Sequence, residues 1–189
     1  VAKQLRDGAV IVYPTDSCYA LGCHLGDKVA TERIRTIRRF DKHHLFTLVC
    51  RDLSDVGSYA KLDNTQFRLL KTMTPGPYTF VLKASHEAPR RMLHEKRKTI
   101  GLRIPDHTIT QALLHTLAEP LLSCTLILPP DELPVSDPTL SRAQLNGQVD
   151  IVLEAGDCGY EPTTVIDLTE DTPRLIRKGK GEVNWLTPV

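Results

Sequence analysis

Short apolar runs alternate with stretches of helical period along most of the chain. Apolar runs rich in β-forming residues predict strands at residues 9–15, 46–50, 78–84, 100–105 and 121–129. Amphipathic patterns predict helices at residues 27–40, 53–62, 64–73 and 108–119. This alternation predicts an α/β protein in which helices pack on a large sheet.

Within these elements, a few positions carry specific expectations. Asp63 or Asn64 is expected to cap the third predicted helix, because both side chains can accept hydrogen bonds from its first turn. In the predicted helix 108–119, Ala112 and Leu113 are expected to point toward the core.

In the last third of the chain, predicted strands follow one another with only one short helix among them. Residues 141–145 predict a short helix after the proline-rich surface loop 129–138. Closing strands are predicted at residues 150–156, 163–168 and 174–178. Residues 183–189 predict a tail or a terminal strand. The opening residues fit the middle of an amphipathic helix and do not begin with methionine, so we expect a preceding segment.

Composition indicates one soluble domain spanning residues 1–189. Hydrophobic residues make up 41% of the chain and charged residues 25%, and there is no repeat or linker. No apolar run approaches the ~20 residues of a membrane helix, and no signal peptide is visible, so we expect a cytoplasmic protein. The formal net charge is +1, so any nucleic-acid binding would depend on local clusters of charge.

The five cysteines form no C-x-x-C pair, so no zinc or dithiol site is predicted. Free thiols suit a reducing compartment. Cys50 and Cys124 lie in apolar runs and are expected in the core.

Residues 14–22, directly after the first predicted strand, combine small hydroxyls with one carboxylate. Ligands of α/β sheets gather at such strand ends. An ordinary turn would use the same residue types, so the pattern alone leaves both interpretations open.

Two basic clusters are candidates for binding phosphate groups. Arg35, Arg38 and Arg39 share one face of helix 27–40, and Lys42, His43 and His44 would extend that face beyond it. Either an anion neutralises this face, or it is solvated and paired with nearby carboxylates. The second cluster comprises Arg90, Arg91, Lys96, Arg97 and Lys98.

Polar side chains also occur inside predicted strands. Arg103 lies among apolar residues and therefore needs a carboxylate or phosphate partner. Ser123 and Thr125 share one face of their strand, where they could meet a ligand or simply bond to neighbouring backbone. Arg177 precedes a glycine-rich segment, but no phosphate-binding glycine loop or catalytic triad signature is present.

Several spaced motifs together resemble the YrdC-like superfamily. They are YPTDSCYALGC, PGPYTFVLK, TIGLRIPDH and PTTVIDLTEDTPRLIRKGKG, and they run in the expected order from about Gly8 to Gly181. The segment FTLVCRDLS is similar to the YciO branch. The resemblance implies a single-domain YrdC/RibB-like fold, with a large twisted mixed sheet, packed helices and a concave, positively charged face.

The resemblance also implies a function, threonylcarbamoyl-AMP synthesis from threonine, bicarbonate and ATP with release of pyrophosphate, in tRNA modification. ATP with Mg²⁺ would be a substrate, and neither a tightly bound cofactor nor a protein metal site is implied. Catalytic roles would fall to Arg38 and Arg103. Nucleotide- or threonine-binding roles would fall to Thr15, Ser17, Tyr19, Ser123, Thr125, Thr164 and Arg177.

Two departures from the family pattern put ordinary synthase activity in question. Thr36 stands where the family motif has a lysine, and Ile127 stands where it has an asparagine. Threonine supplies no charge, and isoleucine supplies no hydrogen bond.

Two further hypotheses therefore accompany the synthase. The chain could be a module that binds tRNA or double-stranded RNA beside a degenerate pocket, or a metabolite enzyme that shares only the fold. RNA contacts would then come from Arg35, Arg39, Lys42, Arg97 and Lys98.

Overall fold

The computed structural model describes residues 1–41 and 44–186. Its helices are α1 (Ala2–Arg6), α2 (Lys28–Arg38), α3 (Leu53–Tyr59), α4 (Asn64–Met73), α5 (Thr108–Leu117) and α6 (Arg142–Leu145), with short 3₁₀ turns η1 (Arg90–Met92) and η2 (Pro138–Ser141). Its strands are β1 (Ile11–Tyr13), β2 (Ala20–His24), β3 (Thr47–Val49), β4 (Tyr78–Lys83), β5 (Thr99–Arg103), β6 (Leu121–Thr125), β7 (Ile151–Val152), β8 (Thr164–Asp167) and β9 (Arg174–Arg177).

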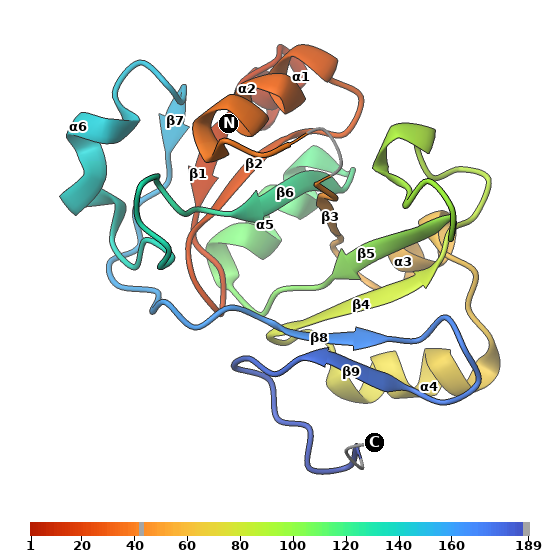
Figure 1. Ribbon diagram of the computed structural model, residues 1–189. Helices are drawn as coiled ribbons and strands as arrows, with labels where there is room; N and C mark the ends of the chain where they lie inside the picture. Colours follow the sequence, from red (N-terminus) through yellow and green to blue (C-terminus); the bar gives the residue numbers. More distant parts are fainter. Residues whose placement is uncertain (42–43, 187–189) are drawn as a thin grey trace.

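All these strands belong to one mixed sheet. Its nine strands run in the order β7-β1-β2-β6-β3-β5-β4-β8-β9. Three neighbouring pairs are parallel, namely β1–β7, β3–β5 and β4–β8, and the others are antiparallel. The predicted large mixed sheet with packed helices is confirmed (Figure 1).

The helices cover the two faces of the sheet unequally. On one face, α2, α3 and α4 pack through Ile34, Val56 and Leu70 on a long row of buried strand residues. On the other face, α1 and α5 cover only the part around β1, β2 and the start of β6. The rest of that second face is not covered by a helix, as the arrangement in Figure 1 shows.

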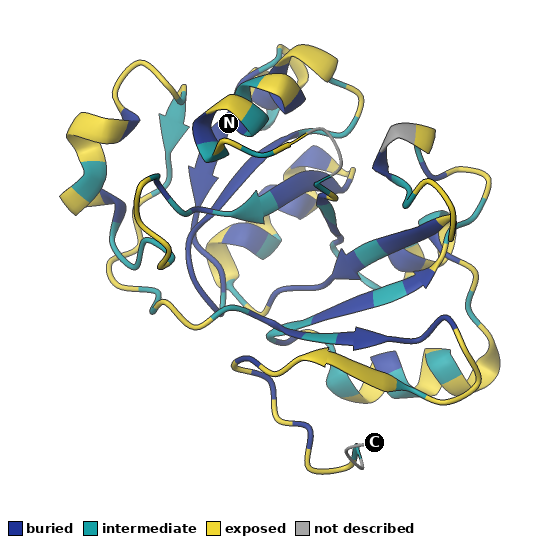
Figure 2. Ribbon diagram, in the orientation of Figure 1, coloured by how far each residue is buried: buried dark blue, intermediate teal, exposed yellow. Residues whose placement is uncertain are grey.

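The inward face of α5 differs from the prediction. Leu113 is buried as expected, and Leu114 and Leu117 accompany it in the second core cluster. Ala112 is exposed, because the buried face of α5 is formed by Leu113, Leu114 and Leu117. Figure 2 shows the same alternation of buried and exposed positions around each helix.

The sequence pattern missed β2, because its first residues were interpreted as part of a hydroxyl-rich loop. Ala20 pairs with Tyr13 and Gly22 with Ile11, so the loop itself is only Pro14–Tyr19. Gly22 allows this pairing, since a Cβ there would lie 2.8 Å from Cε1 of Tyr13. The apolar alternation of Tyr19–Cys23 was the available signal.

The predicted helix 27–40 ends earlier than expected. Arg39 adopts a left-handed conformation with φ 53°, which terminates α2 after Arg38. Arg39 is therefore not on the helix face that Arg35 and Arg38 share. Lys42 and His43 lie outside the described residues. At the other end of the chain, residues 183–186 form no strand.

Among the described residues, no helix has both the length and the apolar character that crossing a membrane requires.

The cap of α4 is Asp63, whose carboxylate accepts a hydrogen bond of 2.7 Å from the backbone N–H of Gln66. We expect Asp63→Ala to lower the free energy of unfolding by about 1 kcal/mol. Asn64→Ala, one residue inside the helix, should have less effect. Urea denaturation of both variants measures the difference, and equal losses would contradict the assignment of the cap.

Candidate functional site

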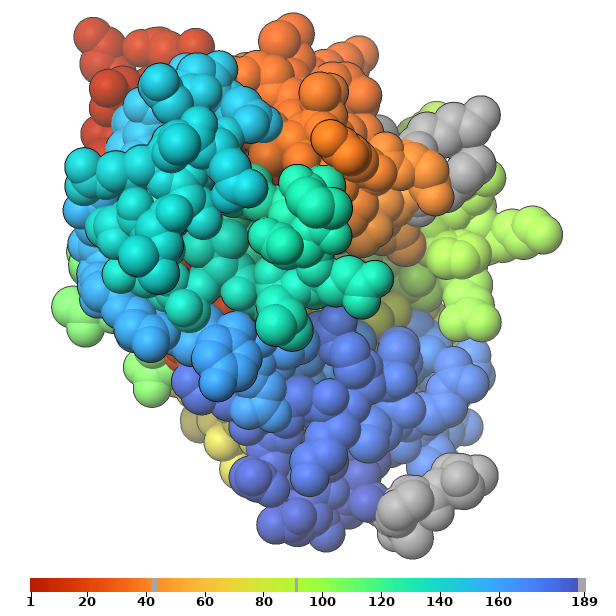
Figure 3. Space-filling view, turned by 60° about the vertical axis from the view of Figure 1, so that its left-hand side comes forward, coloured from red at the N-terminus to blue at the C-terminus, as the bar shows by residue number. Residues whose placement is uncertain are grey.

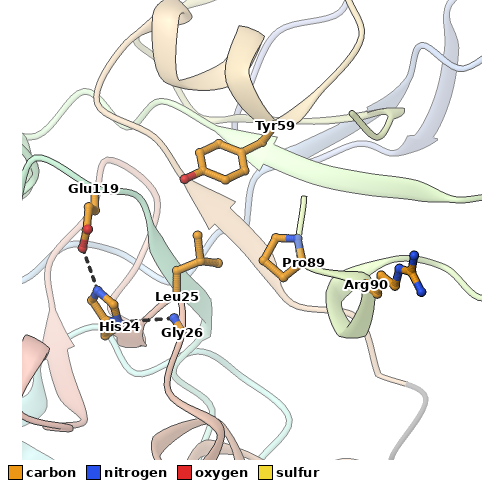
Figure 4. A pocket seen from close by; sticks show the side chains of 7 residues that line it. All are labelled: His24, Leu25, Gly26, Tyr59, Pro89, Arg90 and Glu119. Carbon is orange, nitrogen blue, oxygen red and sulfur yellow. Dashed lines mark hydrogen bonds and ion pairs between the residues drawn. The ribbon is translucent and has the colours of Figure 1, made fainter. Parts of the chain in front are cut away.

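A cavity of about 550 Å³ opens on the uncovered part of the sheet. Its floor consists of alternate residues on neighbouring strands, which point to one face because the side-chain period of a strand is two. These residues are Thr47 and Val49, Thr79 and Val81, Thr99, Gly101 and Arg103, and Ser123 and Thr125. Segments after β6 and before β8 complete the walls, and Figure 3 shows the loop after β6, in green, beside the blue C-terminal segments.

Three arginines from distant parts of the chain line this cavity. Arg38 reaches it from the last turn of α2, Arg103 from the end of β5 and Arg177 from the end of β9. Glu132 is the one carboxylate among the described residues that line the cavity. The lining therefore carries an excess of positive charge, although the whole chain is nearly neutral.

Arg38 is held by contacts that leave part of its guanidinium free for a ligand. Its Nη1 donates a hydrogen bond of 2.8 Å to the carbonyl of Ile127, and its Cζ lies 4.4 Å from the ring centroid of Phe40. Its Nε is buried without a hydrogen-bond partner among the described residues. Burial lowers the pKa of Arg38 from its usual value, since the charged form is incompletely solvated. An anion would restore that solvation.

Arg103 has the carboxylate partner that its place in a strand predicted. Its Nη2 forms an ion pair with Asp16, and its Nη1 donates to the hydroxyl of Ser17 at 3.3 Å. The other oxygen of Asp16 accepts a hydrogen bond of 2.8 Å from the backbone of Asp106. The charge of Arg103 is thereby largely balanced, but its Nε is also buried without a partner among the described residues.

Arg177 is fixed against the chain before β8. Its Nε and Nη2 donate to the carbonyl of Thr163 at 3.3 and 2.9 Å. Burial lowers the pKa of Arg177 as well. Since no carboxylate lies among these contacts, Arg177 supplies net positive charge to the cavity.

Hydroxyl groups surround the arginines, and some of them are already bonded. Ser123 lies 2.5 Å from the hydroxyl of Tyr13 and donates to the carbonyl of Leu21, so protein groups satisfy it. Thr79 and Thr163 bond to each other at 2.8 Å. Thr125 is half-buried at the cavity wall.

The structure thus brings together five of the residues selected from the sequence: Arg38, Arg103, Ser123, Thr125 and Arg177. Thr15, Ser17, Tyr19 and Thr164 lie outside the lining.

Thr15 organises the turn before β2, because its hydroxyl accepts from the backbone of both Ser17 and Cys18. Ser17 contacts two residues of the lining, Arg103 and Cys18. Tyr19 points away, and its hydroxyl donates to the carbonyl of Gly156 at 2.8 Å. The contacts of Thr15 and Tyr19 therefore hold the loop before β2 in place and do not face the cavity.

Thr164 lies on the opposite side of its strand from the cavity. Its hydroxyl donates to the carbonyl of Gly181 at 2.6 Å and accepts from the backbone N–H of Gly179 at 3.0 Å. Its neighbour Thr163 lines the cavity instead. A shift of one residue changes the face of a strand, which the motif alone did not reveal.

The candidate RNA-binding residues are dispersed. Arg35 is mostly buried, with its Cζ 4.8 Å from the Phe46 ring centroid. Arg39 and Lys98 are exposed in left-handed conformations. Arg97 is 60% exposed and 4.0 Å from Asp167.

The two departures from the family pattern lie in different places. Ile127 lines the cavity, so an apolar side chain replaces an amide there. Thr36 is exposed on α2 outside the lining, and its hydroxyl donates to the carbonyl of Glu32.

Sequence reasoning missed several lining residues, chiefly apolar and aromatic ones: Phe40, Leu133 and Tyr160. Leu133 and Tyr160 are 69% and 64% exposed at the rim of the cavity. Their only signal was their position in loops next to strand ends.

Two cysteines also line the cavity, Cys18 and Cys124. Cys124 is only half-buried, which corrects the expectation of a core position, whereas Cys50 is fully buried. Burial raises the pKa of Cys124 to about 12 and also raises that of Cys18. Both remain thiols near neutral pH, so neither supplies a nucleophilic thiolate.

Comparisons with known proteins agree with this architecture. The family model of the Sua5, YciO and YrdC proteins, described as telomere recombination, matches residues 3–179. The uncharacterized protein YciO of Escherichia coli K12 is 55% identical over 95% of this chain and 87% of its own length. The crystal structure of E. coli YciO superposes with a TM-score of 0.91, at 54% identity over 97% of this chain and 89% of that one.

More distant relatives have named activities or ligands. Threonylcarbamoyl-AMP synthase of Vibrio vulnificus is 29% identical over 95% of this chain and 96% of its own. P. abyssi Sua5 complexed with L-threonine gives a TM-score of 0.85 at 25% identity, over 94% of this chain and 52% of that one. With the family model covering nearly its whole length, the chain belongs to the Sua5/YciO/YrdC family.

Proposed function

We propose that this chain binds ATP in the arginine-lined cavity and condenses it with threonine and bicarbonate to threonylcarbamoyl-AMP. One observation carries the proposal: three arginines and a set of hydroxyls converge on a cavity of about 550 Å³ that holds a single described carboxylate. Such a lining suits a triphosphate joined to a polar nucleoside. The relatives named as synthases and the complex of Sua5 with L-threonine support the substrate class.

The reaction needs positioning and charge stabilisation rather than a protein nucleophile. The threonine amine and bicarbonate combine to a carbamate with loss of water. A carbamate oxygen then attacks the α-phosphorus of ATP, and pyrophosphate leaves with the electrons of the broken bond. The raised pKa values of both cavity thiols agree with a route that involves no enzyme-bound intermediate.

The arginines would divide this work. Arg38 and Arg177 carry charge without a carboxylate among their hydrogen-bond contacts, and so they would bind phosphate oxygens. Arg103 is held by Asp16 at the cavity floor and would help to orient a ligand there. Mg²⁺ would enter with ATP and offset charge on the leaving pyrophosphate.

The decisive test is pyrophosphate release by purified protein given ATP, Mg²⁺, threonine and bicarbonate. We expect release that requires both threonine and bicarbonate, measured with a coupled pyrophosphatase assay. Omission of either substrate is the control. If ATP binds but no threonine-dependent release occurs, synthase activity is excluded under these conditions and the cavity serves another acceptor.

Removal of the positive charge of Arg38 tests whether this residue contacts the ligand or only stabilises the fold. Arg38→Ala is expected to lower the rate of pyrophosphate release by a factor of about 10² to 10³, because one charge-assisted contact in the transition state is lost. Arg68→Ala, an exposed change on α4, is the matched control. Equal rates in both variants, with folding checked by circular dichroism, would contradict the role of Arg38.

RNA binding is the second candidate, because Arg39, Arg97 and Lys98 present exposed positive charge and Ile127 weakens the polar character of the cavity. If RNA binds through phosphate contacts, its affinity should fall steeply with salt. Arg97→Ala should reduce the salt slope by about one. Filter binding of tRNA across a salt series measures this, and an affinity independent of salt would exclude the mode.

A further inference from the structure

One wall of the cavity is an aromatic cluster that includes a histidine. The rings of Phe40 and His44 stack with centroids 3.4 Å apart and planes 13° apart. Phe46 meets both rings edge-on, at 6.4 Å from Phe40 and 6.1 Å from His44. All three side chains line the cavity, so the stacked imidazole lies at the cavity surface.

Two arginines flank this cluster and bring positive charge to the histidine. Arg38 lies over Phe40, and Arg35 lies over Phe46. Nη1 of Arg35 also donates to the carbonyl of His44 at 3.2 Å. Two arginines thus lie close to the histidine, Arg38 in the cavity lining and Arg35 behind it.

Opposing negative charge near His44 is limited. Glu32 pairs with Arg35 at 3.3 Å and is 73% exposed. Asp41 faces His44 and accepts from its backbone N–H through its own carbonyl. Glu132 is across the same cavity. Burial, then the charges of Arg38 and Arg35, lower the pKa of His44, whereas Asp41 acts in the opposite direction.

A bound anion would offset the positive charge around His44. We propose that His44 contacts the phosphate part of the ligand and takes up a proton when that group binds between Arg38 and the aromatic wall. The inference rests on the proposed function in so far as the cavity binds phosphate, but it does not depend on which acceptor reacts.

The direction of the pH dependence follows from the linkage between anion binding and protonation of His44. An anion stabilises the imidazolium, because it offsets the repulsion from both arginines and satisfies the ring N–H groups. The protonated protein then binds the anion more tightly, so affinity rises as pH falls toward the pKa of the free protein. Each unit by which binding raises the pKa of His44 corresponds to about tenfold in affinity between the two protonation states.

Sulfate is the appropriate probe, since it mimics phosphate but keeps its charge throughout the range in which histidine titrates. We would follow the histidine ring protons by NMR between about pH 5 and pH 8, with and without sulfate. His44→Gln identifies the resonance by its loss. His115→Gln, an exposed change on α5, should leave the sulfate dependence of His44 intact. Calorimetry of sulfate binding provides the matching affinities.

We expect sulfate to move the His44 titration to higher pH, and we expect His44→Gln to abolish the rise in sulfate affinity at low pH. Arg177→Gln should weaken binding at every pH, which assigns the sulfate to the cavity. Sulfate binding without any change in the His44 titration would overturn this inference and leave the proposed function standing. Failure of sulfate to bind would overturn the anion site and this inference together. Absence of synthase activity, with the titration shifted, would overturn only the proposed reaction.

Discussion

The ion pair between Asp16 and Arg103 joins segments that would otherwise border the cavity independently. Asp16 belongs to the loop between β1 and β2, whereas Arg103 ends β5, three strands away across the sheet. The same aspartate accepts a hydrogen bond from the backbone of Asp106, and its carbonyl accepts one from Lys180 at 2.5 Å. Both side chains of the pair are only 10% exposed, so removal of either would leave a buried charge without its partner. The loop between β1 and β2, the end of β5 and the segment at Lys180 are therefore held together around this contact.

The unequal covering of the sheet explains why polar groups collect where they do. Helices α2, α3 and α4 cover one face with apolar side chains, but α1 and α5 cover only part of the other. Strand residues beyond that cover need not be apolar, and most of the positions concerned are threonines, a serine, a glycine and an arginine, with valines among them. The cavity is thus the remainder of a sheet face that the chain does not use for its core.

The sequence predicted the architecture well, because most elements depend on local patterns. Periodicity located α2, α4, α5 and most strands, and the motif resemblance identified the family. The missed strand β2 begins within a polar turn, where hydroxyl residues hid its alternation.

The site was harder to predict, since it depends on which face each side chain occupies. Thr164 was selected where Thr163 lines the cavity, a difference of one residue in register. His44 and Tyr160 lie in connecting segments that carry no period at all. Arg103, by contrast, was found because an arginine among apolar neighbours requires a partner wherever it lies. Arg38 and Arg177 were found from the basic helix face and from the family motifs.

The place of Arg177 at the end of β9 has a consequence for how the protein matures. β9 is the last strand in sequence and lies at the edge of the sheet, next to β8. During synthesis, the strands that make the floor emerge from the ribosome long before this arginine does. A nascent chain can thus build most of its sheet while one wall of the cavity is still missing. The cavity is then complete only once β9 has paired with β8 and brought Arg177 to its place in the lining.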